Sequence, residues 1–174
     1  MKQGFLLVFF SLLIIACTNS QSQTPPVELK HFALNSVDDV RATTGVSFDR
    51  QISSDGKGSI RVDAAEPMIV PLFEVSDVSI ENAVLIYQAS LQSQKLDGKA
   101  FLEMWVRLPG KGEYFSRGLD RPITGTTTWM TIVTPFFLQA GQKPDLIRLN
   151  LVVQGKGTVW INDIHLMRAP LPSH

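Results

Sequence analysis

Two apolar segments of the chain carry polar and aromatic side chains at every second position. In AFLEMWVRL, residues 100–108, Glu103, Trp105 and Arg107 alternate with large apolar residues. In LIRLNLVV, residues 146–153, Arg148 and Asn150 alternate in the same way. Because successive side chains of a β-strand point to opposite faces of its sheet, both segments predict one core face and one half-polar face.

The half-polar face has the side chains of a sugar-binding platform. An aromatic ring packs against the apolar C–H face of a pyranose, while planar polar groups hydrogen-bond its hydroxyls. The candidate ligand-binding residues are Glu103, Trp105, Arg107, Tyr114, Arg148 and Asn150. The alternative is ordinary cross-strand pairing of Trp105 with its charged neighbours beneath a loop. A groove with an exposed ring favours a glycan, and a flat apolar patch favours a protein.

Sequence motifs of the common catalytic sites are absent. The histidines, at positions 31, 165 and 174, include no pair with metal-ligand spacing, and the chain has neither an H-E-x-x-H motif nor a G-x-S-x-G elbow. Glu103 and Glu113 are a candidate carboxylate pair, but a chain with 16 acidic residues offers many such pairs. We therefore expect a protein that is not an enzyme. A small hydrolase would instead place two carboxylates face to face in a pocket.

Three Gly-Lys-Gly triplets occur, at residues 56–58, 110–112 and 155–157. A phosphate-binding loop requires G-x-x-x-x-G-K-[ST] before a helix, whereas each lysine here is followed by glycine. The triplets therefore predict three hairpin turns, in which glycine supplies a positive φ, and they exclude nucleotide binding.

The body of the chain has the pattern of an all-β sandwich or barrel, since short apolar and β-branched runs are broken by Gly, Pro, Asp and Asn. The predicted strands are residues 46–52, 58–64, 68–75, 83–92, 100–108, 113–118, 128–138, 146–153 and 158–167. Residues 36–41 predict one helical turn, with Ser36 as its N-cap and Asp39 three positions later.

The last third of the chain resembles the galactose-binding-like β-sandwich, or jelly-roll, modules found among carbohydrate-binding modules. The matching positions are Gly125, Thr126, Trp129, Gly157, Thr158, Val159, Trp160, Ile161, Asn162, Asp163 and Ile164. The resemblance extends over about residues 45–168. It implies a jelly roll of about nine strands in which Trp129 and Trp160 hold fold positions. Such modules bind sugars, other ligands or only neighbouring domains.

Some members of that superfamily hold a structural calcium ion near the closing strand, and the resemblance places Asp163 at that site. Asn162 replaces the second acid of the family pattern. Calcium requires six to eight oxygen ligands. Asp38, Asp39 and Asp63 are candidate partners, and the alternative is that each acid lies in a solvated loop or turn.

The N-terminus resembles the lipobox signal of bacterial lipoproteins. Residues 5–16 form a twelve-residue apolar run, too short for a transmembrane helix and suited to a signal peptide. Ile14, Ile15 and Ala16 then precede Cys17, the chain's single cysteine. The resemblance implies cleavage after residue 16 and acylation of Cys17. Thr18, in place of the aspartate that retains such proteins at the inner membrane, favours the outer membrane. Residues 17–26 have the composition of a flexible tether.

Removing residues 1–16, which include one lysine, leaves 15 basic and 16 acidic side chains in 158 residues. This length suits one domain, and the charge balance excludes the basic face that nucleic-acid binding requires. The sequence therefore predicts a lipid-anchored outer-membrane protein with one non-catalytic β-sandwich, residues 27–174, that binds carbohydrate. The alternative is an envelope protein that binds another protein or has a structural role.

Overall fold

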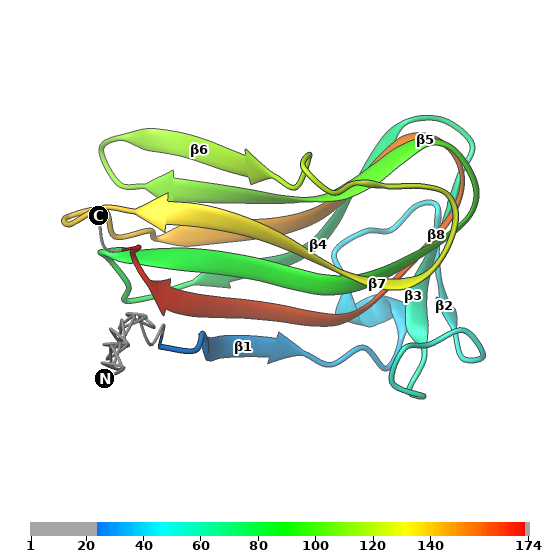
Figure 1. Cartoon of the computed structure of the whole chain (residues 1–174), viewed down its shortest axis with the longest axis horizontal. Helices are drawn as coiled ribbons and strands as arrows, with labels where there is room; N and C mark the ends of the chain where they lie inside the picture. The colour runs from blue at the N-terminus through cyan, green and yellow to red at the C-terminus, as the bar shows by residue number, and fades with distance from the viewer. Residues whose placement is uncertain (1–23, 173–174) are drawn as a thin grey trace, which may run out of the picture.

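The structure, a computed structural model, describes residues 24–172 and consists almost entirely of β-strands (Figure 1). The elements are β1 (Val27–Phe32), the 3-10 turn η1 (Val37–Asp39), β2 (Val46–Asp49), β3 (Ser59–Ala64), β4 (Met68–Ser76), β5 (Ala83–Leu108), β6 (Gly112–Arg117), β7 (Ile123–Leu138) and β8 (Leu146–Pro170). The predicted signal peptide, Cys17 and His174 lie outside the described residues. Within residues 24–172 no helix is long and apolar enough to cross a bilayer.

Two long antiparallel strands, β5 and β8, form the centre of the fold. They pair from Ala83 opposite Pro170 to Arg107 opposite Leu146. Their bend carries them from one layer of the sandwich into the other (Figure 1). One layer has the order β7–β5–β8–β1, and the other has the order β6–β5–β8–β4. The hairpin of β2 and β3 joins β8 at the bend through residues 157–161.

Glycines lie at this bend, where the register of β5 and β8 shifts between Gln94 and Asp97 before the pairing continues. Gly98 lies opposite Gly155, and both have positive φ, at 120° and 154°. A Cβ atom on Gly155 would lie 1.7 Å from the carbonyl oxygen of Asp97. The prediction of a hairpin turn at residues 155–157 is therefore wrong, and two pairs of predicted strands are in fact the single strands β5 and β8. The triplet at residues 110–112 does join the hairpin of β5 and β6.

The predicted alternation is confirmed on the inner faces of β5 and β8. The residues of the predicted core faces are all buried, namely Leu102, Met104, Val106, Leu108, Ile147, Leu149, Leu151 and Val153. On the opposite faces Phe101, Glu103 and Val152 are buried as well. The predicted helical turn is also confirmed, since the Ser36 hydroxyl accepts from the Asp38 N–H and the Asp39 carboxylate accepts from the Ser36 N–H. Strand β1 was not predicted, and five of its six residues are exposed, with only Phe32 buried.

One core residue, Tyr87, has a fully buried hydroxyl group with no hydrogen-bond partner among the described residues. Burial raises the pKa of this phenol, so the group stays neutral. An unpaired buried polar group costs free energy. We therefore expect Tyr87→Phe to raise the free energy of unfolding by ~1 kcal/mol, measured by urea denaturation. A decrease of that size would show that the hydroxyl has a partner, such as a buried water.

Candidate functional site

The candidate site lies on the outer face of the β6–β5–β8–β4 layer. The strand register aligns its side chains in rows that cross all four strands. One row contains Pro71, Asn150, Glu103 and Arg117, and the next contains Glu74, Arg148, Trp105 and Phe115. Residues from three separate parts of the sequence therefore meet on one surface, because β4 and β6 flank the two long strands.

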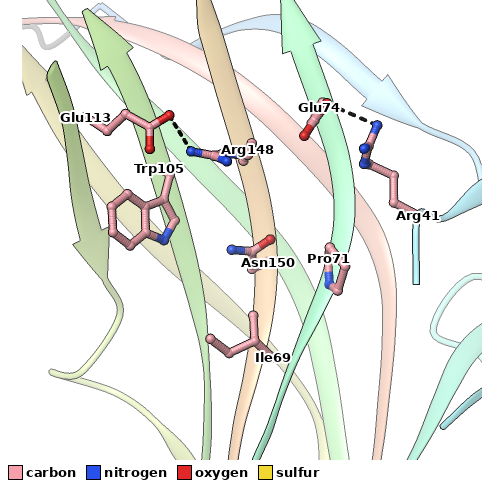
Figure 2. Close-up of a pocket in the computed structure, with 8 residues that line it drawn as sticks. All are labelled: Arg41, Ile69, Pro71, Glu74, Trp105, Glu113, Arg148 and Asn150. Atoms are coloured by element: carbon pink, nitrogen blue, oxygen red, sulfur yellow. Dashed lines mark hydrogen bonds and ion pairs between the residues drawn. The ribbon is translucent and has the colours of Figure 1, made fainter. Parts of the chain in front are cut away.

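This face is hollowed into a groove of about 640 Å³ (Figure 2). Its lining residues are Arg41, Ile69, Pro71, Glu74, Trp105, Glu113, Arg148 and Asn150. A smaller hollow of about 220 Å³ adjoins it at Ile69 and continues past Arg117 and Gln154. The two hollows share Ile69 and together extend across this face.

Glu103 is fully buried beneath the groove and organises its polar side chains. Its Oε1 accepts hydrogen bonds from the Trp105 indole at 2.8 Å and the Asn150 amide at 3.1 Å. Its Oε2 accepts from the Arg117 guanidinium at 2.6 Å. Burial opposes ionisation of Glu103, but these three hydrogen bonds outweigh it and lower the pKa of the carboxyl group. The charged carboxylate thus fixes the orientation of both the Trp105 ring and the Asn150 amide.

We expect Glu103→Gln to lower the free energy of unfolding by about 1–3 kcal/mol at pH 7, because it weakens charge-assisted hydrogen bonds at a buried position. A carboxyl group whose pKa falls on folding stabilises the protein above its unfolded-state pKa, and this stabilisation is lost as the pH falls through the folded-state value. The difference between wild type and variant should therefore be complete at pH 7 and shrink below about pH 4. Urea denaturation at pH 7, 5 and 3.5 measures it, with the exposed Glu66→Gln as control. A difference that is independent of pH would contradict this role of the charge.

Two ion pairs border the groove. Arg148 pairs with Glu113 on one side, and Arg41 pairs with Glu74 at 3.0 Å on the other, as the dashed lines in Figure 2 show. Their side chains remain partly exposed. The groove therefore has an aromatic and apolar floor and a polar rim, the combination found in small-molecule sites.

An aromatic cluster extends the floor toward β6. The Phe115 ring lies 5.1 Å from the Trp105 ring, tilted by 47°, and is 52% exposed. The Arg117 guanidinium lies 4.5 Å from the centre of the Phe115 ring. Phe115 was not among the candidate ligand-binding residues, although the alternation of Glu113, Phe115 and Arg117 along β6 is a signal for a shared face.

The structure brings Trp105, Arg148 and Asn150 together in the groove and places Glu103 directly beneath them. Arg107 is paired instead with Asp145 at 2.8 Å and does not line the groove. Tyr114 lies opposite Val106, a core-facing residue, and its hydroxyl donates to the Lys111 carbonyl. Tyr114 is therefore on the opposite face from Trp105. The register of β6 determines this position, and that register cannot be read from the sequence.

The carboxylates considered for a hydrolase do not face each other. Glu103 is hydrogen-bonded to Trp105, Asn150 and Arg117, whereas Glu113 is paired with Arg148 on the rim. A general acid requires a raised pKa. The lowered pKa of Glu103 is the reverse of that requirement.

Two of the three acids proposed to share a calcium ion with Asp163 are engaged elsewhere. Asp39 caps η1, and Asp63 is paired with Arg61 at 2.9 Å. The Asn162 amide donates to Asp55 in the loop between β2 and β3. Asp163 itself lies beside two imidazole rings, those of His31 and His165. A donor set of nitrogen and few oxygens does not fit calcium.

Comparison with known proteins gives matches in structure only. No family model matches the sequence, and no curated protein matches it. The CBM22-1 xylan-binding domain from Paenibacillus barcinonensis Xyn10C aligns with a TM-score of 0.56 and 13% identity, over 82% of this chain and 93% of that domain. The CBM22-1–GH10 modules of Clostridium thermocellum Xyn10B, complexed with xylohexaose, align with a TM-score of 0.60 and 9% identity, over 85% of this chain and 30% of that one.

A third match is TmCBM61 in complex with β-1,4-galactotriose, with a TM-score of 0.50 and 16% identity over 74% of this chain and 86% of that one. At such low identities the likeness concerns the fold. The chain has the β-sandwich fold of carbohydrate-binding modules, which confirms the fold class expected from the sequence.

Proposed function

We propose that this protein is a non-catalytic binding protein whose groove holds a carbohydrate chain. The observation that carries the proposal is the grouping of a half-buried Trp105 ring with the Asn150 amide and the Arg148 guanidinium in one groove. An aromatic ring beside planar hydrogen-bonding groups is suited to a pyranose, which has an apolar C–H face and a rim of hydroxyls.

The polar groups retain hydrogen-bonding capacity for a ligand. Asn150 uses its Nδ2 atom to donate to Glu103, so its carbonyl oxygen can accept from a hydroxyl. Arg148 donates to Glu113 through one nitrogen and has further N–H groups. Because these side chains are held by partners, little conformational entropy is lost when a ligand binds.

The presence of two adjoining hollows on this face favours an oligosaccharide over a single sugar. Two of the structural neighbours were solved with oligosaccharides, one with xylohexaose and one with β-1,4-galactotriose. We therefore propose a β-1,4-linked polysaccharide as the ligand class, with these two oligosaccharides as the first to test.

The lipobox-like sequence supports a membrane-anchored form of this protein. Acylation of Cys17, followed by a tether to about residue 26, would hold the sandwich close to a membrane, and we propose the outer membrane. Mass spectrometry of the detergent-extracted protein tests the anchor. An unmodified Cys17, or a mature chain that begins elsewhere, would contradict it.

A protein partner is the second candidate, and a different surface favours it. Val133 and Phe137 on β7 are 46% and 51% exposed, and they lie on the other layer of the sandwich. Such exposed apolar side chains are common at protein interfaces.

A glycan array probed with the purified protein distinguishes the two candidates. The carbohydrate proposal predicts specific binding to β-linked oligosaccharides, followed by a measurable affinity in calorimetry. No binding to any glycan, by a protein shown to be folded by circular dichroism, would contradict the proposal. Crosslinking in the intact envelope would then test for a protein partner.

A further inference from the structure

A second cluster of ligand-type side chains lies on the β7–β5–β8–β1 layer, away from the groove. His31 of β1 lies directly opposite His165 of β8, and the two rings stack with centres 4.4 Å apart and planes 8° apart. Asp163 precedes His165 by two residues on β8. The cluster therefore joins the first and last strands of the fold.

A β-bulge aims Asp163 at the two rings. On β5 the register passes from Gln88, opposite His165, to Ser90, opposite Asn162, so β8 has one extra residue there. Asp163 lies in this bulge and has a φ of 51°. Bulges commonly redirect a side chain in this way. The side chain of Asp163 is 41% exposed, which leaves the cluster accessible to an ion.

The ligand atoms of the three side chains converge. Asp163 Oδ1 lies 2.8 Å from His165 Nε2 and 3.8 Å from His31 Nε2, and all three ligand atoms lie within 4.8 Å of one another. Zinc bonds of about 2.0–2.1 Å at a tetrahedral angle would place such atoms roughly 3.4 Å apart. Because the two rings are stacked, the imidazoles must rotate about their side-chain bonds to turn both Nε2 lone pairs toward one ion, so the site forms with a local rearrangement of His31 and His165.

Glu28 contacts the other ring nitrogen of His165, Nδ1. Its Oε2 atom lies 2.7 Å from His165 Nδ1, so it is placed to accept the Nδ1–H hydrogen bond and leave Nε2 with its lone pair. Metal-binding histidines are usually oriented by a carboxylate in this manner. His165 Nε2 then faces Asp163 Oδ1 at 2.8 Å, and a positive charge between these two atoms satisfies both.

A divalent cation between these atoms would satisfy both electron pairs, and imidazole with carboxylate is a donor set that suits zinc rather than calcium.

We infer that His31, Asp163 and His165 form a Zn²⁺ site, with Glu28 as the carboxylate that orients His165. The ion takes His31 Nε2, Asp163 Oδ1 and His165 Nε2 as protein ligands and fastens β1 to β8. The site is on the other layer from the groove, so the inference is independent of carbohydrate binding.

Titration of the full-length protein with Zn²⁺, in competition with a chromophoric chelator, tests the site. We expect one zinc ion whose affinity falls at least 100-fold in His31→Gln and in His165→Gln. We also expect it to fall 10–100-fold in Glu28→Gln, the usual effect of losing an orienting carboxylate. The control is Asp120→Asn, which changes an exposed acid away from the cluster and should bind zinc as the wild type does.

Thermal unfolding gives an independent readout. Zinc should raise the melting temperature of the wild type and of Asp120→Asn but not of His31→Gln, whereas calcium should have no such effect. Because the His31 side chain is 40% exposed, His31→Gln should fold even if His165→Gln does not. Zinc binding that survives both histidine substitutions, or equal stabilisation by calcium, would overturn the inference.

Discussion

Trp105→Ala is expected to reduce the affinity for the bound oligosaccharide by about 30-fold. The ring belongs to the floor of the groove and is the aromatic side chain among its lining residues. Aromatic residues at the centre of binding sites commonly contribute ~2 kcal/mol or more, which corresponds to about 30-fold in affinity. Isothermal titration calorimetry of wild type and variant measures the change.

The control for this prediction is Phe137→Ala, which removes an exposed aromatic ring from the other layer of the sandwich. It should bind the oligosaccharide as the wild type does. Trp105→Ala leaves Glu103 its hydrogen bonds with Arg117 and Asn150, so the variant should remain folded. If Trp105→Ala binds normally, or if Phe137→Ala loses binding, the groove is not the glycan site.

Gly155→Ala is expected to lower the free energy of unfolding by ~4 kcal/mol or more, or to prevent folding. The new methyl group would lie 1.7 Å from the Asp97 carbonyl oxygen, and the φ of 154° at this position already excludes most side chains. The clash is with backbone rather than with a flexible side chain. Relief therefore requires β5 and β8 to separate where they pass between the two layers.

Gly110→Ala is the matched control for the bend. Gly110 also has a positive φ, at 72°, but a Cβ atom there would meet nothing within 4 Å. Its substitution should cost only the ~1–2 kcal/mol of a left-handed conformation. Urea denaturation, or the soluble yield where a variant does not fold, compares the two. Equal effects at both positions would show that the close approach at Gly155 has no special importance.

The period-two alternation of apolar side chains was a better guide to the fold than the positions of the Gly-Lys-Gly triplets. Period-two patterns in residues 100–108 and 146–153 identified the core faces correctly, because burial on one face imposes that period. Glycine at residues 155–157 was interpreted as a turn. A turn and a bend within a continuous strand both require positive φ, and the difference depends on which strand lies opposite, which is a long-range feature.

The same limit applies to the candidate site. Trp105, Arg148 and Asn150 were predicted to share a surface because each alternates with core residues on its own strand. Tyr114 was assigned to that surface without knowledge of the β6 register, which instead places Phe115 there. The cluster of His31 and Asp163 was also not predicted, since it depends on the pairing of β1 with β8 and on a bulge.

The most direct test of the central claim is an NMR titration that follows the indole N–H resonances of the three tryptophans. The Trp105 indole donates to Glu103 beneath the groove, whereas the Trp160 indole is almost fully buried and donates to Asp49. If the groove binds the tightest-binding oligosaccharide from the array, we expect a large shift of the Trp105 resonance and little change at Trp129 and Trp160. A saturable titration that leaves Trp105 unchanged, or that moves only the other two, would contradict the proposal that this groove binds the glycan.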